Sequence, residues 1–287
     1  MPLVQREICV DGARLTLLER EAKPDAGRAP IVLLHGMAAS AGTMEPLIAE
    51  LPPERRLIAL NIPGSELPDS ATLSDVSLQG LARQVRDCAQ MLGLERPVLL
   101  GHSHGGAIAL QMAASFPEEV SGLILLAPAH PFLFRERWIV AFYNSWAGPI
   151  VLHAISFLPK WMQGFGFSRL MGPAGRKRKI DWQPYRDAFK RPGNVAQLLR
   201  LLKTWSADMD ALGVQIKAHK IAAPTLFLWG DVDAIVPIKT AAALEACVQQ
   251  WELVTLRGAG HLPNEEAAEE CGSAMRAWLQ RPVDGVS

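Results

Sequence analysis

Three residues of the sequence stand in settings that suit nucleophilic catalysis. Ser103 is the centre of Gly101-His102-Ser103-His104-Gly105, a G-x-S-x-G pattern between a predicted strand and a predicted helix. Asp233 and His261 each follow another predicted strand. A histidine that accepts the serine proton, and that is itself oriented by a carboxylate, turns the hydroxyl into a nucleophile. The sequence therefore predicts that Ser103 attacks an electrophilic carbon, with His261 as general base and an aspartate behind it.

Two carboxylates compete for the place behind His261. Asp231 and Asp233 both follow the predicted strand 225–229, and they point the same way if this segment stays extended. Their spacing alone does not choose between them. The aspartate that does not pair with the histidine is expected to cap or brace the loop.

Six short apolar runs are predicted to be the strands that position these residues. They are continuous rather than alternating, which is typical of parallel strands covered by helices on both faces. A hairpin signal at Asp11-Gly12-Ala13, between residues 8–10 and 14–18, adds an antiparallel start to the sheet. Because the serine, aspartate and histidine all follow parallel strands, they are expected to converge at one edge of the sheet. The six runs are residues 31–34, 57–60, 98–100, 123–126, 225–229 and 253–256.

Helices are predicted between the strands, together with one long insertion. They cover 78–92, where apolar residues recur every three or four positions and Ser77 is available as a cap, and also 103–116 and 265–279. Residues 130–215 are instead rich in Trp and Phe and lack strand signals. We therefore expect a helical cap, or lid, above the carboxyl ends of the strands, where ligands bind. The predicted organisation is a core at 1–129, the cap at 130–215, and the rest of the core at 216–287.

An attacked carbonyl needs hydrogen-bond donors for its developing oxyanion. The turn His35-Gly36-Met37 directly follows the run 31–34, so the N–H of Met37 is one predicted donor. The N–H of His104, the residue after the nucleophile, is the other. The alternative for His35-Gly36 is an ordinary turn with a hydrogen-bonded histidine. For residues 101–105 the alternative is a phosphate loop, but no Lys-Ser or Lys-Thr follows, as such a loop requires.

These motifs resemble the α/β-hydrolase superfamily, in its cap-bearing esterase and C–C hydrolase branch, over almost the whole chain. His35-Gly36 resembles the oxyanion loop, and Asn61-Ile62-Pro63-Gly64 resembles the D-x-x-G turn. Residues 101–105 resemble the nucleophile elbow, and Gly260-His261 with Glu265 resembles the histidine loop.

The resemblance implies a mostly parallel eight-stranded sheet flanked by helices, with a helical cap insertion. It also implies Asp233 as the third residue of the triad, because the family places this acid at the start of a D-x-x-V-P pattern that here ends at Pro237. Asp231 would then brace the loop. Two positions depart from the family pattern: Asn61 replaces a usual Asp, and Ser65-Glu66 replace a common His-Gly.

The implied activity is hydrolysis of a carboxylic ester, or a related acyl bond, of a small apolar substrate without a cofactor. A C–C bond hydrolase, a lactonase, a thioester hydrolase and a cofactor-free perhydrolase or acyltransferase are alternatives on the same triad. A ligand-binding receptor without turnover is a further one. Lys plus Arg and Asp plus Glu number 29 each, so no overall charge favours a nucleic acid. Candidate pocket residues are His35, Gly36, Trp138, Phe142, Trp146 and Trp205.

Other polar residues are expected to be structural. His102 and His104 diverge around the turn, and no thiol or carboxylate stands near them in the sequence, so no metal site is predicted. His130 and His153 are interpreted as cap or core histidines. Three arginines are interpreted as solvated charges, one of which could pair with a substrate carboxylate: Arg135, Arg137 and Arg191.

Cysteine usage and the absence of a targeting signal favour a cytoplasmic location. Four scattered cysteines indicate buried free thiols, and residues 1–11 lack the apolar run of a signal peptide. The uncharged stretch 138–158 is interrupted by polar residues, Gly and Pro, so it is interpreted as a lid rather than a membrane span. The basic run 176–179 is usually a solvated loop, with peripheral contact to an anionic membrane as the alternative. The cysteines are Cys9, Cys88, Cys247 and Cys271.

Overall fold

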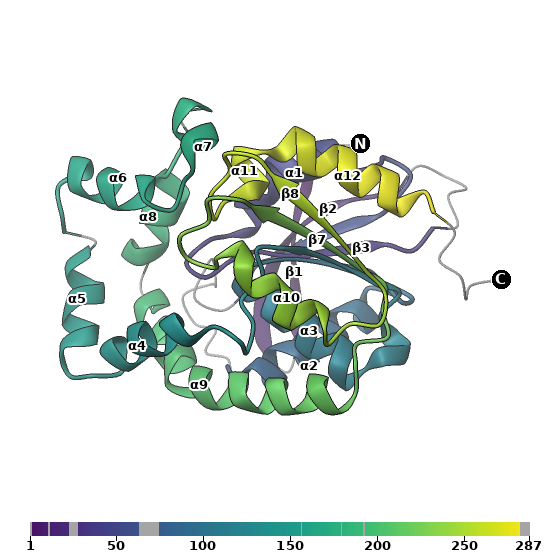
Figure 1. Ribbon diagram of the computed structural model, residues 1–287, viewed down its shortest axis with the longest axis horizontal. Helices are drawn as coiled ribbons and strands as arrows, with labels where there is room; N and C mark the ends of the chain where they lie inside the picture. Colours follow the sequence, from purple (N-terminus) through teal and green to yellow (C-terminus); the bar gives the residue numbers. More distant parts are fainter. Residues whose placement is uncertain are drawn as a thin grey trace.

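One sheet of eight strands runs through the molecule in the order β1-β2-β4-β3-β5-β6-β7-β8 (Figure 1). The structure is a computed structural model, and it describes residues 2–10, 12–22, 28–62, 75–155, 157–178, 180–191 and 193–281. β1 and β2 are antiparallel to their neighbours, and all other neighbouring strands are parallel. This is the predicted sheet. Its strands are β1 (Val4–Val10), β2 (Ala13–Arg20), β3 (Ile31–Leu34), β4 (Leu57–Leu60), β5 (Val98–His102), β6 (Gly122–Leu126), β7 (Thr225–Gly230) and β8 (Trp251–Leu256).

The central strands β3 to β7 are buried along their whole length, which explains their continuous apolar sequences. β8 differs from this pattern, because only Leu256 is buried and the strand begins two residues before the apolar run, at Trp251. It lies at the edge of the sheet, where one side has no neighbouring strand. At the other edge the predicted hairpin is confirmed, since Val10 pairs with Ala13. The hairpin's Asp11 lies outside the described residues.

Two helical layers cover the sheet. Successive strand residues point to opposite faces, so Val32 packs in one layer and Ile31 in the other. The layer with Val32 contains α2 (Leu78–Met91), α3 (His104–Ser115) and α10 (Ala241–Glu245). The layer with Ile31 contains α1 (Glu45–Glu50) and α12 (Ala268–Leu279). The predicted cap of α2 is present, because Ser77 Oγ accepts a hydrogen bond from the Gly80 N–H at 3.1 Å.

Six helices of the described chain lie between β6 and β7. Figure 1 shows α4, α5 and α6 at the outer edge of this insertion and α9 running along α2 and α3. None of the described helices combines the length and apolar character that a bilayer crossing requires. The uncharged stretch 138–158 is instead divided between α4 and α5. The six helices are α4 (Phe134–Tyr143), α5 (Ala147–Ile155), α6 (Lys160–Ser168), α7 (Pro173–Arg178), α8 (Gln183–Lys190) and α9 (Asn194–Ala218).

Two expectations about the ends of the chain are corrected. The helix predicted over 265–279 is divided into α11 (Pro263–Glu266) and α12, because Ala267 has φ −140° and ψ 40°, outside the helical region. The four cysteines are free as expected, but Cys9 is exposed, because it lies on the edge strand β1. The tail 282–287 lies outside the described residues.

Two glycines, which have no side chain, allow α3 to approach the sheet closely. A Cβ at Gly105 would lie 2.1 Å from the carbonyl oxygen of Leu34 on β3. A Cβ at Gly101, the fourth residue of β5, would lie 2.5 Å from the carbonyl oxygen of Gly105. Both distances are far shorter than a van der Waals contact, so the two glycines set how near the start of α3 lies to the ends of β3 and β5.

We expect Gly105→Ala to lower the free energy of unfolding by about 1–3 kcal/mol, because the added methyl group meets main-chain atoms that cannot rotate away. Gly166→Ala in α6 is the matched control, since nothing lies within 4 Å of a Cβ there. Alanine is the better helix former, so the control should be neutral or up to about 1 kcal/mol more stable than the wild type. Urea denaturation measures both variants. Equal stability of wild type and Gly105→Ala would show that α3 is not closely packed.

Candidate active site

Ser103 stands at the sharp turn between β5 and α3. Its backbone has φ 50° and ψ −113°, a strained conformation for a residue with a side chain. Hydrogen bonds on both sides hold it there: the Ser103 N–H donates to the Leu126 carbonyl at 3.0 Å, and the Ser103 carbonyl accepts from the Ala129 N–H at 2.9 Å. The surrounding chain therefore fixes the strained turn that presents the hydroxyl.

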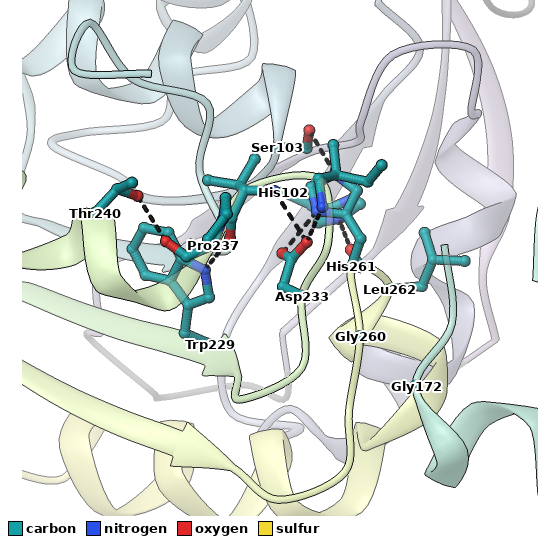
Figure 2. A network of polar contacts seen from close by, with 12 residues as sticks. His102, Ser103, Gly172, Trp229, Asp233, Pro237, Thr240, Gly260, His261 and Leu262 are labelled. Atoms are coloured by element: carbon teal, nitrogen blue, oxygen red, sulfur yellow. Dashed lines mark hydrogen bonds and ion pairs between the residues drawn. The ribbon is translucent and has the colours of Figure 1, made fainter. Parts of the chain in front are cut away.

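The three residues singled out by the sequence lie in one hydrogen-bonded row (Figure 2). Ser103 Oγ is 3.0 Å from His261 Nε2, and His261 Nδ1 is 2.8 Å from Asp233 Oδ2. Ser103 follows β5, Asp233 follows β7, and His261 follows β8, all at the carboxyl ends of parallel strands. The side chain of Asp233 is fully buried and that of His261 is 8% exposed.

The contacts of this row determine where its protons sit. Because a carboxylate accepts at Nδ1, the proton of the neutral His261 ring is on Nδ1, and Nε2 carries a free lone pair. The Ser103 hydroxyl therefore donates to Nε2. A histidine in this state is arranged to accept the serine proton during an attack.

The two competing aspartates have different partners. Asp233 Oδ1 accepts hydrogen bonds from the N–H groups of Ile235 at 2.8 Å and Val236 at 2.9 Å, which leaves Oδ2 for His261. Trp229 Nε1 donates to the Val236 carbonyl at 2.7 Å and fixes the same turn. Asp231 Oδ1 instead accepts from the Gly258 N–H at 2.7 Å, so it braces the loop after β8.

His102 holds the main chain of His261, a contact that the sequence did not predict. Its Nε2–H donates to the His261 carbonyl at 2.7 Å, and the two ring centres are 5.2 Å apart. Burial lowers the pKa of His102 to about 3, so it is a neutral donor. Its position inside the G-x-S-x-G pattern was visible, but the sequence gives no sign of a bond to a residue so far along the chain.

Glu266 organises the histidine loop, whereas the sequence resemblance had pointed to Glu265. Glu266 Oε2 accepts from the N–H groups of Gly172 at 2.8 Å and Gly260 at 2.9 Å, and Oε1 accepts from the Leu262 N–H at 2.9 Å. The residue is 1% exposed, so its buried carboxylate is satisfied by main-chain donors. Glu265 instead accepts a hydrogen bond from the Tyr185 hydroxyl of α8.

The helical insertion contributes main-chain groups to the same loop. The Leu170 carbonyl accepts from the His261 N–H at 2.8 Å, and the Ala174 N–H donates to the Gly258 carbonyl at 3.0 Å. Gly172, which donates to Glu266, lies between them; Figure 2 shows it beside Leu262. Residues 170–174 and the loop that carries His261 therefore form one hydrogen-bonded unit.

The chain segments that carry the two predicted oxyanion donors lie beside Ser103. A Cβ on Gly36 would lie 3.5 Å from Ser103 Cβ, which places the loop before Met37 against Ser103. His104 begins α3, and the first N–H groups of a helix have no partner within it. His35 matches the alternative of a hydrogen-bonded turn histidine: its Nδ1–H donates to the Gly36 carbonyl at 2.7 Å, and its Nε2 accepts from the Ile62 N–H at 2.9 Å.

The aromatic residues predicted to line a pocket separate into two groups. Trp205 is 3% exposed, and its ring centre lies 5.3 Å from that of His104, the residue after Ser103. Trp138, Phe142 and Trp146 are 81%, 46% and 84% exposed. They are not walls of a closed pocket: Trp138 and Phe142 lie on the side of α4 opposite its buried Val140, and Trp146 lies on the turn before α5.

The remaining candidates are structural or lie apart from the serine. His130 Nε2–H donates to Thr240 Oγ1 at 2.9 Å in the buried interior, and His153 donates to the Pro149 carbonyl at 2.8 Å on the surface. Arg191 is exposed. The side chains of Arg135 and Arg137, and residues 63–66 of the predicted turn, lie outside what the structure describes. In the described part of the chain, no three His, Cys, Asp or Glu side chains gather as a metal site.

Glu265 makes stability depend on pH. Burial raises the pKa of its carboxyl from 4.5 to about 7, with smaller effects from Asp181 and Glu266, while the Tyr185 hydroxyl lowers it. Between pH 4.5 and about 7, the carboxyl of Glu265 ionises more readily in the unfolded chain than in the folded one. The contribution of Glu265 to stability is therefore complete below pH 4.5 and is lost as pH rises to about 7.

We expect the melting temperature of the wild type, relative to that of Glu265→Gln, to fall between pH 4.5 and about 7 and then to level off. The amide stays neutral throughout and still accepts from Tyr185, so the variant lacks this pH dependence. Thermal unfolding across this pH range is the measurement, with Glu269→Gln as a surface control whose side chain is 74% exposed. A constant difference between wild type and Glu265→Gln would refute the assignment.

Comparisons with known proteins agree with this architecture. The family model described as "alpha/beta hydrolase fold" matches residues 29–268. The uncharacterized hydrolase YugF of Bacillus subtilis (strain 168) is 27% identical over 265 residues, which cover 92% of this chain and 93% of that protein. The crystal structure of Cfl2 from Burkholderia cenocepacia superposes with a TM-score of 0.82 at 23% identity, covering 96% of this chain and 95% of that one. A thermophilic esterase from Thermogutta terrifontis gives a TM-score of 0.72 at 21% identity and covers 98% of both chains. Because the family match extends over most of the sequence, the chain belongs to the alpha/beta hydrolase family.

Proposed function

We propose that the protein is a serine hydrolase that cleaves a carboxylic ester of a small apolar substrate, with Ser103 as nucleophile. The observation that carries the proposal is the row from Ser103 Oγ to His261 Nε2 at 3.0 Å and from His261 Nδ1 to Asp233 Oδ2 at 2.8 Å. The base is within direct hydrogen-bond reach of both the nucleophile and the orienting carboxylate, and the nucleophile is only partly buried.

The first half of the proposed reaction forms an acyl-enzyme. Ser103 Oγ bonds to the carbonyl carbon while its proton passes to His261 Nε2. The N–H groups of Met37 and His104 donate to the resulting oxyanion, and the N-terminal end of α3 favours negative charge there. The carbon–oxygen bond to the alcohol then breaks, and the alcohol leaves with the proton from His261.

The second half releases the acid. A water molecule gives a proton to His261 Nε2 and attacks the acyl carbon, and the bond to Ser103 Oγ breaks as the serine recovers its proton. Asp233 holds the ring by Nδ1 throughout and stabilises the imidazolium that forms in each half. His102 and Leu170 hold the main chain of His261 at its carbonyl and N–H. They act as positioning groups for the histidine.

The surroundings of Ser103 favour an uncharged, apolar substrate. Burial lowers the pKa of His35 to about 4 and those of His102 and His104 to about 3, so these imidazoles are neutral at physiological pH. The indole of Trp205 adds an apolar surface beside His104. Neutral rings of this kind offer a charged substrate little compensation for the water that it would lose.

We expect Ser103→Ala to lower turnover of a chromogenic short-chain ester by at least about 10³-fold, because the nucleophile is removed. Circular dichroism checks that the variant is folded. A fluorophosphonate probe should label the wild type on the peptide that contains Ser103 and should leave the variant unlabelled. Unchanged turnover in Ser103→Ala would end the proposal, and labelling of a wild type without turnover would instead indicate a ligand receptor.

The two aspartates provide a matched pair of variants. We expect Asp233→Asn to lower kcat by about 10⁴-fold, because the amide donates toward Nδ1 and forces the ring proton onto Nε2, which then cannot accept from Ser103. Asp231→Asn should stay within about tenfold of the wild type, because an amide oxygen still accepts from Gly258. Steady-state kinetics on the same ester compares them. Equal losses in both variants would exclude the assigned division of roles.

A further inference from the structure

Large apolar side chains are exposed on the part of the insertion farthest from the sheet. Trp146 is 84% exposed and Phe157 is 85% exposed, on the turns before and after α5. Trp161 on α6 is 74% exposed, and Ile150 on α5 is 60% exposed. Soluble monomers seldom expose such a concentration of aromatic rings without a binding role. We call the exposed surface of α4, α5 and α6 that carries these side chains, with Trp138 and Phe165, the outer face.

On both α4 and α6 the exposed apolar residues share one side of the helix. Trp161 and Phe165 are four positions apart on α6 and are both exposed, whereas Phe167, toward the opposite side, is buried. Trp138 and Phe142 have the same spacing on α4, opposite the buried Val140. Figure 1 shows α4, α5 and α6 following one another along the outer edge of the molecule. The exposed apolar residues therefore lie on helices that follow one another along this edge of the molecule.

The charged residues of the segment 137–180, which includes α5, α6 and α7, are all basic. From residue 137 to residue 180 the sequence has no Asp or Glu, and it has seven Lys and Arg residues. Lys160 and Arg169 stand at the two ends of α6 and are exposed. Of the basic residues on α7, Arg178 reaches an exposed glutamate of α12, Glu269, at 3.6 Å. The whole chain is neutral, so this insertion segment concentrates positive charge beside exposed aromatic rings.

We propose that the outer face docks onto the surface of an anionic lipid bilayer. The tryptophan rings, which have one apolar and one polar side, would lie in the headgroup region, and the Phe and Ile side chains would enter the acyl boundary beneath it. The basic residues of α6 and α7 would lie against lipid phosphates. The protein lies on the bilayer in this arrangement and does not cross it. The proposal concerns a surface separate from Ser103 and does not depend on the reaction proposed above.

Charge favours a lipid surface over a second copy of the chain. A symmetric dimer through the outer face would bring each basic segment near its own copy, with no acidic residue between 137 and 180 to compensate. An anionic bilayer supplies both the apolar layer that the rings require and the negative charge that the lysines and arginines require. The combination of the two features selects this partner.

Vesicle cosedimentation with the full chain tests the proposal. We expect the affinity for phosphatidylcholine vesicles that contain phosphatidylglycerol to be at least about tenfold higher than for phosphatidylcholine alone, and to fall as salt is added. Ser103→Ala should bind like the wild type, which separates docking from hydrolysis. Lys160→Gln with Arg169→Gln and Lys177→Gln should remove the preference for anionic vesicles.

The combined variant Ile150→Gln, Phe157→Gln and Trp161→Gln should lower binding to anionic vesicles by about tenfold or more, while its melting temperature and its turnover of a soluble ester stay unchanged. The matched control is Val214→Gln with Trp251→Gln, at side chains that are 71% and 47% exposed on α9 and β8, and it should bind like the wild type.

Three results would overturn the proposal. The first is that the wild type binds neither kind of vesicle. The second is that the combined variant binds as well as the wild type. The third is a dimer at micromolar concentration, seen by light scattering, that the combined variant abolishes, because it would assign the outer face to a second copy.

Discussion

The hydrogen bond between His261 Nδ1 and Asp233 Oδ2, 2.8 Å long and buried, fixes the geometry on which the site depends. It selects the ring tautomer and turns a free lone pair toward Ser103. Two main-chain N–H groups hold the other oxygen of Asp233, and the main chain of His261 is held by His102 and Leu170. The bond therefore joins the loops after β7 and β8 to the elbow after β5 and to the helical insertion.

The site concentrates features that oppose folding. Ser103 has a strained φ of 50°, the carboxylate of Glu266 is buried, and burial raises the pKa of Glu265 to about 7. Each is balanced locally by hydrogen bonds: Ser103 by its main-chain partners, Glu266 by three N–H donors, and Glu265 by Tyr185. Apolar burial between the sheet and its two helical layers stabilises the fold and offsets the free-energy cost of these groups.

The sheet and the row of three residues were accessible from the sequence, because continuous apolar runs mark buried strands and the site residues directly follow them. The choice between Asp231 and Asp233 was not accessible from spacing, since the chain turns after β7 and the two side chains diverge. Glu266 and His102 act through contacts that exist only in the folded chain. Composition identified an aromatic insertion but not its orientation, which is why Trp138 was expected in a pocket and is found on the surface.

The insertion leaves the sheet after β6 and returns at β7, and these strands are direct neighbours, with Leu126 paired to Leu228. Because the two strands are parallel, the chain leaves at the carboxyl end of β6 and returns to the amino end of β7, and α9 runs along α2 and α3 on the way back. Lengthening or shortening the segment before α9 changes the entropy of closing this connection only slowly. Such a segment can be replaced by one of different length or sequence without altering the register of the strands. The exchange has one restriction in this protein: a replacement must still offer a carbonyl to the His261 N–H, as Leu170 does, and an N–H to Glu266, as Gly172 does. The fold can therefore acquire a new substrate specificity through this segment, provided that the carbonyl at position 170 and the N–H at position 172 keep their places.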